Sequence, residues 1–213
     1  EERFEEMLHP YIGKSRTELK AQFGITSMAK NINEILVAAM LGLKGRLAST
    51  DEFQKASIVP KTITIGPGNT IKESMSFPAM DFCKMVNEKW EESDLYNCLA
   101  PTKFLFIVFK REDDGEYYFR SIKFWNIPVE DLEEVHRVWQ RTVDILREGV
   151  HIWKDSRGRN CNNLPKASES NVAHVRPHGV NSMDTAPLPM GGEMTKQCFW
   201  LNSTYVAEQI KEV

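Results

Sequence analysis

The stretch that most constrains the fold is an apolar run followed by a tight turn and a second strand-like run. Residues 103–110 read KFLFIVFK, which is typical of a strand buried on both faces. Asp113-Asp114-Gly115 favours a hairpin turn into another strand at residues 117–125. Apolar residues at helical spacing then predict a long helix over residues 129–150. Together these segments indicate an α+β fold, with a mixed central sheet and helices outside it.

The other segments continue this mixture of helices and strands. Ser15 and Glu18 have the spacing of a capping box, which predicts a helix that ends at Gly24. A stripe of apolar side chains predicts a third helix from about Ala29 to Leu43. The remaining expectations are helices over residues 3–8, 81–90 and 203–211, strands over 58–65, 70–77 (the return strand of a hairpin), 172–177 and 196–201, and loops over 157–170 and 179–192.

The composition is that of a soluble globular domain. Hydrophobic residues make up 41% of the 213 residues and charged residues 27%. The sequence begins without Met, so we expect a piece of a longer chain, with two lobes of about residues 1–110 and 111–213 around a DNA cleft. We see no signal peptide and no apolar run near the ~18 residues of a membrane span, so we expect a cytoplasmic protein without a membrane partner. The four cysteines are widely separated, which predicts reduced thiols.

The distribution of charge is more informative than its total. The net charge is −3 and the pI about 6.0, so the whole chain is not basic. Cations nevertheless predominate over residues 14–30 and 151–182, whereas acids gather at the N-terminus and over residues 112–148. Such a division suits one DNA-facing side, although ordinary solvated patches can show the same pattern.

An alternating segment at residues 58–65 follows two acids, Asp51 and Glu52. Side chains two apart on a strand share a face, so Val59 and Lys61 point the same way. In many Mg²⁺-dependent nucleases such a strand carries carboxylate-x-Lys, and the acids hold the cation. Valine cannot ligate Mg²⁺, so the pattern favours a nuclease-like domain that binds DNA without cutting it.

Five motifs in this order resemble the MutH family of DNA mismatch-repair endonucleases, which includes restriction endonucleases that cut at GATC. The matching residues are Gly13-x-Ser15-x-x-Glu18-Leu19, Lys30 before a helix ending at Leu41-Gly42, Asp51/Glu52 with Lys61-Thr62-Ile63, Arg176-Pro177 and Phe199-Trp200-Leu201. The resemblance covers residues 13–65 and 172–210 well, and between residues 78 and 170 it is only an order of elements. It implies a single restriction-endonuclease-like domain over residues 1–213.

The resemblance also implies which positions would form a metal site. The family Glu late in its second conserved helix corresponds to Ala38, and the strand acid corresponds to Val59. The upstream acid corresponds to Glu52, or to Asp51 after a shift of one residue, and the strand Lys is Lys61. We therefore expect a degenerate site with no catalytic residue and no metal in this domain, and Mg²⁺ only in the full-length enzyme. Glu34, one turn before Ala38, is the alternative source of a carboxylate.

DNA-contacting positions of the family are better preserved. Lys30 lies at the start of the third helix, where a phosphate would bind, and Arg176 can contact guanine or phosphate. Lys14 belongs to the first basic stretch. The full expected set is Lys14, Lys30, Arg176, His178, Trp200, Asn202 and Ser203. For Lys30, Trp200, Asn202 and Ser203, a solvated end, core packing or helix capping remains the structural alternative.

Three functions follow as hypotheses. The first is a non-cleaving effector domain of a type II restriction endonuclease that binds GATC duplex and activates an N-terminal catalytic half of the same chain, with two DNA sites and a dimer as one way to bridge them. The second is an active Mg²⁺-dependent endonuclease that uses Glu34 with Asp51 or Glu52. The third is a dimerisation or docking module with little affinity for DNA.

Overall fold

The structure is a computed structural model that describes residues 1–43, 45, 47–71 and 74–211, without the side chains of Glu52 and Asn69. It is a mixed α/β chain divided into two compact units. Unit 1 is formed by the described residues within 1–73, 101–126 and 207–213, and unit 2 by those within 74–100 and 127–206. The chain passes between the units more than once, so a single cut near residue 110 falls inside a strand of unit 1.

A three-stranded mixed sheet forms the centre of unit 1. Its strands are β1 (Ile58–Ile65), β3 (Lys103–Arg111) and β4 (Tyr117–Trp125), in the order β1-β3-β4. β1 runs parallel to β3, and β4 runs antiparallel to it, which confirms the expected hairpin. The middle strand is almost completely buried from Phe104 to Phe109, as its continuous apolar sequence predicts. β1 is an edge strand, the position in a sheet where a proline such as Pro60 is tolerated.

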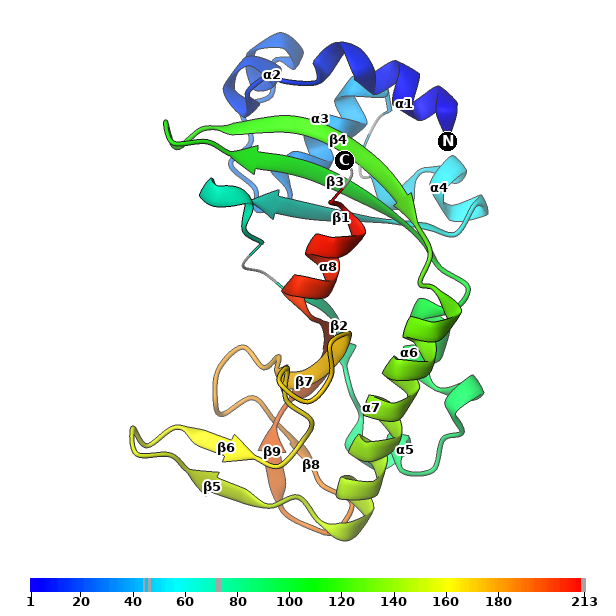
Figure 1. Ribbon diagram of the computed structural model, residues 1–213, viewed down its shortest axis with the longest axis vertical. Coiled ribbons are helices and arrows are strands. Elements are labelled where there is room, and N and C mark those ends of the chain that lie inside the picture. Colours follow the sequence, from blue (N-terminus) through cyan, green and yellow to red (C-terminus); the bar gives the residue numbers. More distant parts are fainter. Residues whose placement is uncertain (44, 46, 72–73, 212–213) are drawn as a thin grey trace. The chain divides into compact units, whose positions relative to one another are not determined.

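Three helices cover one face of this sheet (Figure 1). They are α1 (Glu2–Leu8), α2 (Arg16–Phe23) and α3 (Ile32–Met40), and the short α4 (Asp51–Lys55) precedes β1. Their apolar side chains form one core with Leu105, Ile107 and Phe109, which are alternate residues of β3. α3 is shorter than the expected span of residues 29–43. Residues 30 and 31 form a turn before it, and Gly42 leaves the helical conformation with φ 69°.

The start of α2 confirms the capping box. Ser15 Oγ accepts a hydrogen bond from the Glu18 amide at 3.1 Å, and Glu18 Oε2 accepts one from the Ser15 amide at 2.7 Å. The same segment adds to the edge of β4, because Ser15 pairs with Tyr118. The helix ends at Gly24 in the left-handed conformation, which glycine adopts without a steric penalty.

Unit 2 contains a second, antiparallel sheet in the order β2-β10-β7. Its strands are β2 (Met75–Ala79), β10 (Gln197–Leu201) and β7 (Ala173–Pro177). The expected hairpin between residues 58–65 and 70–77 is therefore wrong, because β2 pairs with β10 in another sheet. The residues expected to form the hairpin turn, Gly66 to Asn69, instead contain a short 3-10 helix at Pro67–Asn69. A local turn signal was overridden by a strand pairing distant in sequence.

The long helix α7 (Val129–Glu148) confirms the expected helix, and it buries a stripe that includes Val135, Trp139, Val143 and Leu146. The expected helix over residues 81–90 is shorter, because α5 ends at Met85, and a separate helix follows after Ser93. Both expected loops contain strands. The remaining elements of unit 2, and α8 after them, are α5 (Phe82–Met85), α6 (Asp94–Leu99), the hairpin of β5 (Ile152–Lys154) and β6 (Asn160–Asn162), the hairpin of β8 (Thr185–Pro187) and β9 (Glu193–Thr195), and α8 (Ser203–Gln209).

All four cysteines are free thiols. In the part of the chain that the structure describes, no helix has the length and apolar character needed to cross a membrane.

Candidate nucleic-acid interface and degenerate metal site

An exposed arginine backed by an aromatic ring forms the strongest candidate contact in unit 2. The guanidinium carbon of Arg176 lies 4.7 Å from the centre of the Trp200 ring, and Trp200 Nε1 donates a hydrogen bond to the Arg176 carbonyl at 3.4 Å. The exposed His178 ring meets the same indole edge-on, with ring centres 5.7 Å apart. A cation held over an aromatic face is orientated without being neutralised, so the Arg176 guanidinium stays available to an anion.

The register of β7 and β10 explains this cluster. Arg176 pairs with Cys198 and Trp200 pairs with His174, so all four side chains lie on one face of the sheet. Arg176 and Trp200 are diagonal neighbours, which long and aromatic side chains can bridge. Further back on the same face, burial raises the pKa of the Cys198 thiol to about 11, so the thiol is protonated and inert at neutral pH. The cluster therefore has a buried support and an exposed cationic end.

Asn202 is part of that support. It is only 5% exposed, and its amide nitrogen donates to the Ser170 carbonyl at 2.6 Å. Its Oδ1 lies 2.5 Å from His174 Nδ1, which therefore carries a proton in the neutral ring. Because these bonds occupy the side chain, Asn202 holds β7 against β10 instead of offering a phosphate contact. Sequence reasoning missed His174, and the alternation of AHVRP was the signal that would have placed it on the Arg176 face.

The other expected contacts lie at helix and strand ends. Ser203 is half-buried and begins α8, where the Asn202 carbonyl accepts the first helical bond, from Val206. In unit 1, Lys30 is exposed just before α3. The Lys14 side chain donates to Gln22 at 2.8 Å and lies against the Tyr11 ring, so it is already engaged within unit 1.

The positions of the expected metal site divide between the two faces of the unit 1 sheet. Ala38 is 2% exposed and belongs to the core that α3 forms with Leu105 and its neighbours. Val59 and Lys61 align with Phe104 and Phe106, which alternate with that face and so point to the opposite one. Val59 is 38% exposed and Lys61 is half-buried. The structure therefore does not bring Ala38 together with Val59 and Lys61.

The acids near this strand do not complete a cation site in the described residues. Asp51 is exposed at the first position of α4, so the two acids lie in a short helix that precedes β1. The side chain of Glu52 lies outside the described residues. Among those that are described, no group of three His, Cys, Asp or Glu could hold a metal ion. Methyl groups at Ala38 and Val59 supply no oxygen to a hard cation, so these positions do not fit Mg²⁺.

Comparison with known proteins relates the chain to the restriction enzymes of bacteria, in particular to the type II class. It is 35% identical to the type II restriction enzyme Sau3AI of Staphylococcus aureus over an alignment of 247 residues, which covers 98% of this chain. The chain spans about half the length of that relative, namely 50%. No family model matches the chain.

Proposed function

We propose that this chain is a non-cleaving, duplex-DNA-binding module of a restriction system, with a restriction-endonuclease-like fold of the MutH type, that recognises GATC. The observation that carries the proposal is the exposed Arg176 guanidinium held over the Trp200 ring. An arginine fixed in this way suits bidentate contact with guanine in the major groove. His178 and, in unit 1, Lys30 add donors for phosphate.

The absence of cleavage is inferred from the chemistry of β1 and α3. Two of the three family acid positions carry apolar side chains, Ala38 and Val59. Ala38 is buried in the core on the face of the sheet opposite to Val59. A lone acid beside Lys61 lacks the paired carboxylates that activate water and stabilise the leaving oxygen. Lys61 then serves phosphate binding at most.

In the longer protein, the module would act as an effector. It would bind one copy of GATC and favour the cutting-competent state of an N-terminal catalytic half. That half would use Mg²⁺ to cut the DNA at a second copy of GATC. Such coupling is reciprocal, so an occupied catalytic half must also tighten effector binding. Looping or dimerisation would bridge the two sites, in the bacterial cytoplasm where restriction acts.

Titration of the chain against a GATC duplex and a scrambled duplex of equal length tests the binding proposal. We expect tighter binding to GATC, with a preference that persists as salt is raised and the shared phosphate contribution falls. Equal, salt-limited affinity for both duplexes would remove the claim of specific recognition.

One observation favours an active endonuclease as a second candidate. Glu34 Oε1, in the first turn of α3, is buried and accepts no hydrogen bond from the described residues. Together with Asp51 or Glu52 it would supply two carboxylates. A plasmid-nicking assay with Mg²⁺ or Mn²⁺ separates this candidate from the first. Nicking that Lys61→Ala abolishes would establish it, and intact plasmid would exclude it.

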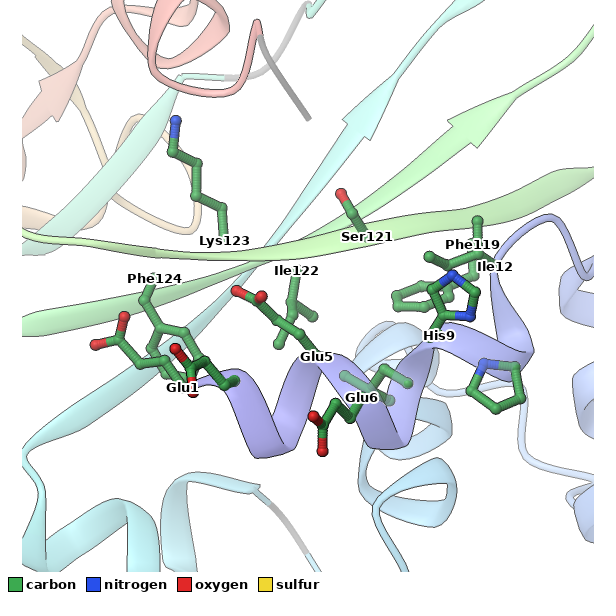
Figure 2. A pocket seen from close by; sticks show the side chains of 13 residues that line it. Glu1, Glu5, Glu6, His9, Ile12, Phe119, Ser121, Ile122, Lys123 and Phe124 are labelled. Atoms are coloured by element: carbon green, nitrogen blue, oxygen red, sulfur yellow. The ribbon is translucent and has the colours of Figure 1, made fainter.

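A different observation favours protein docking. A cavity of about 960 Å³ lies between α1 and β4, with a rim that includes Glu1, Glu2, Glu5 and Glu6. Figure 2 shows the Phe119 and Ile122 side chains on its floor and Glu5 reaching toward β4. Carboxylates repel the DNA backbone, so this surface suits a protein partner. DNA affinity unchanged by Arg176→Ala and Lys30→Ala would favour this docking function over the first.

A further inference from the structure

The β5–β6 hairpin exposes apolar surface that the fold does not use. Ile152 is 40% exposed and Trp153 is 41% exposed, although both lie in a paired strand. Within unit 2 the hairpin extends away from α7 as a two-stranded arm (Figure 1). An isolated two-stranded hairpin gains little stability by itself, and an exposed tryptophan does not add to it. The arm is therefore better explained by a binding role than by packing.

The tip of the arm is fixed by one carboxylate. Asp155 Oδ1 accepts hydrogen bonds from the amides of Arg157 and Arg159 at 2.9 Å each, and Oδ2 accepts one from Arg159 Nε at 2.7 Å. Gly158 completes the turn with φ 73°, a conformation that suits glycine. The turn is therefore organised before any ligand arrives, which lowers the entropic cost of binding.

The charge of the arm is positive in a chain whose net charge is −3. Residues 151–162 carry Lys154, Arg157 and Arg159 against the single acid Asp155. Asp155 pairs with Arg159 at 2.6 Å. The side chains of Lys154 and Arg157 form no ion pair among the described residues. The ring of Trp153, which precedes Lys154, stacks on His151 with 5.2 Å between ring centres. Lys154 and Trp153 are consecutive residues of β5, so they project from opposite faces of the hairpin. Exposed cations and exposed aromatic rings are both groups that contact a nucleic-acid backbone.

The arm also adjoins the candidate interface. A small cavity is lined by Ile152 and Asn160 of the hairpin together with Pro177 and Gln197 at the paired ends of β7 and β10. Pro177 follows Arg176 directly. The hairpin therefore lies near the strand end that carries Arg176, although Pro177 and Gln197 belong to the opposite face of the sheet from Arg176. A duplex that engages Arg176 and continues past the end of β7 would reach the hairpin.

We infer that the β5–β6 hairpin is a second DNA-contacting element, which grips the phosphate backbone beside the sequence that Arg176 contacts. This inference rests on the proposed DNA-binding function. Lys154 and Arg157 bind phosphate oxygens, and the Trp153 ring packs against the sugar–phosphate chain. Contacts of this kind position the protein and add affinity, but they carry no sequence information.

Salt titration of variants tests the inference. The probes are a GATC-centred duplex and a scrambled duplex, each long enough to extend beyond the recognition sequence. For Lys154→Ala with Arg157→Ala we expect weaker binding to both duplexes, an unchanged ratio between them, and a salt slope shallower by about 2. Trp153→Ala should weaken both duplexes alike with no change of slope. Arg157→Lys alone should keep the salt slope of the wild-type chain, because either cation binds phosphate.

Arg137→Ala is the matched control, since it removes an exposed arginine from α7 that pairs with Glu134. It should leave affinity and slope unchanged. If the wild-type chain prefers GATC and the hairpin variants keep its affinity and slope, the hairpin inference is overturned and the proposed function stands. If the wild-type chain shows no preference for GATC, the proposed function is overturned, and the hairpin inference, which rests on it, falls with it.

Discussion

Arg176 is the residue at which the structure gives the sharpest functional expectation. Its guanidinium lies over the Trp200 ring, and the sequence alone already placed both residues among the expected DNA contacts. We expect Arg176→Ala to reduce the discrimination between GATC and scrambled duplexes by about 1–3 kcal/mol, the range of one bidentate base contact. Anisotropy titrations of both duplexes measure this, with Arg137→Ala as control. An equal loss on both duplexes would instead assign Arg176 to phosphate.

His174 gives a prediction about stability at the same scale. Burial lowers its pKa, the nearby Arg176 adds to that effect, and the hydrogen bond to Asn202 opposes it. The folded chain then binds fewer protons than the unfolded chain, so the free energy of unfolding falls as pH drops below about 6.5, the unfolded pKa. The loss levels off below the folded pKa.

Urea unfolding followed from near-neutral to mildly acidic pH measures this dependence. We expect His174→Gln, which removes the titrating ring but keeps a donor for Asn202, to flatten it over that range. The same decline with pH in both proteins would show that other groups cause it.

At the scale of elements, the sequence predicted those segments whose signal is local. The capping box of Ser15, the run at residues 103–110 and the stripe of α7 all formed as expected, because each contains its own periodicity or cap. The pairing of β2 with β10 could not be predicted, since nothing near residue 75 indicates a partner more than a hundred residues away. Likewise, three-residue strands such as β5 and β8 are too short to show a period.

The candidate site was predictable to the same degree. Arg176, His178 and Trp200 meet because two well-signalled strands pair. The burial of Asn202 and the separation of Ala38 from Val59 depend on which face each element presents. The order of motifs along the sequence does not indicate which face of a sheet or helix each side chain occupies.

The capping box makes a direct prediction about α2. Ser15→Ala removes the side-chain acceptor for the Glu18 amide and leaves a backbone donor of the first turn unpaired. We expect a loss of about 1 kcal/mol in the free energy of unfolding, measured by urea denaturation. Thr17→Ala, which removes an exposed side-chain hydrogen bond to Glu116 but leaves the cap intact, provides the comparison. A loss no larger than that of Thr17→Ala would mean that the cap contributes nothing to stability.

Ala38 and Val59 lie on different faces of the unit 1 sheet, so we expect that placing acids at both positions does not create a catalytic site. Val59→Glu should change the free energy of unfolding by no more than about 0.5 kcal/mol, because the side chain is partly exposed on an edge strand. Ala38→Glu buries a carboxylate in a core and should cost roughly 2–4 kcal/mol. Urea denaturation of each variant measures both effects.

The same variants can be combined for an activity test. We expect the double variant to leave plasmid DNA intact in Mg²⁺, because the two carboxylates would project from different faces. Mg²⁺-dependent nicking by the double variant would show that the two positions converge after all.

At the scale of the whole molecule, charge is unevenly distributed. The acidic rim of α1 lies in unit 1, whereas the cations of the β5–β6 hairpin and Arg176 lie in unit 2. A net charge of −3 therefore conceals one DNA-compatible surface and one surface suited to protein. Under the proposed function, the cationic surface would meet DNA and the acidic surface a protein partner.

Electrophoresis of one incubation tests the central claim most directly. The chain is mixed with a GATC duplex in Mg²⁺, and the sample is run on a native gel to detect binding and on a denaturing gel to detect cleavage. We predict a retarded complex, competed by GATC but not by scrambled duplex, in which both strands remain full length. Strands cut at GATC, or no retardation at all, would contradict it.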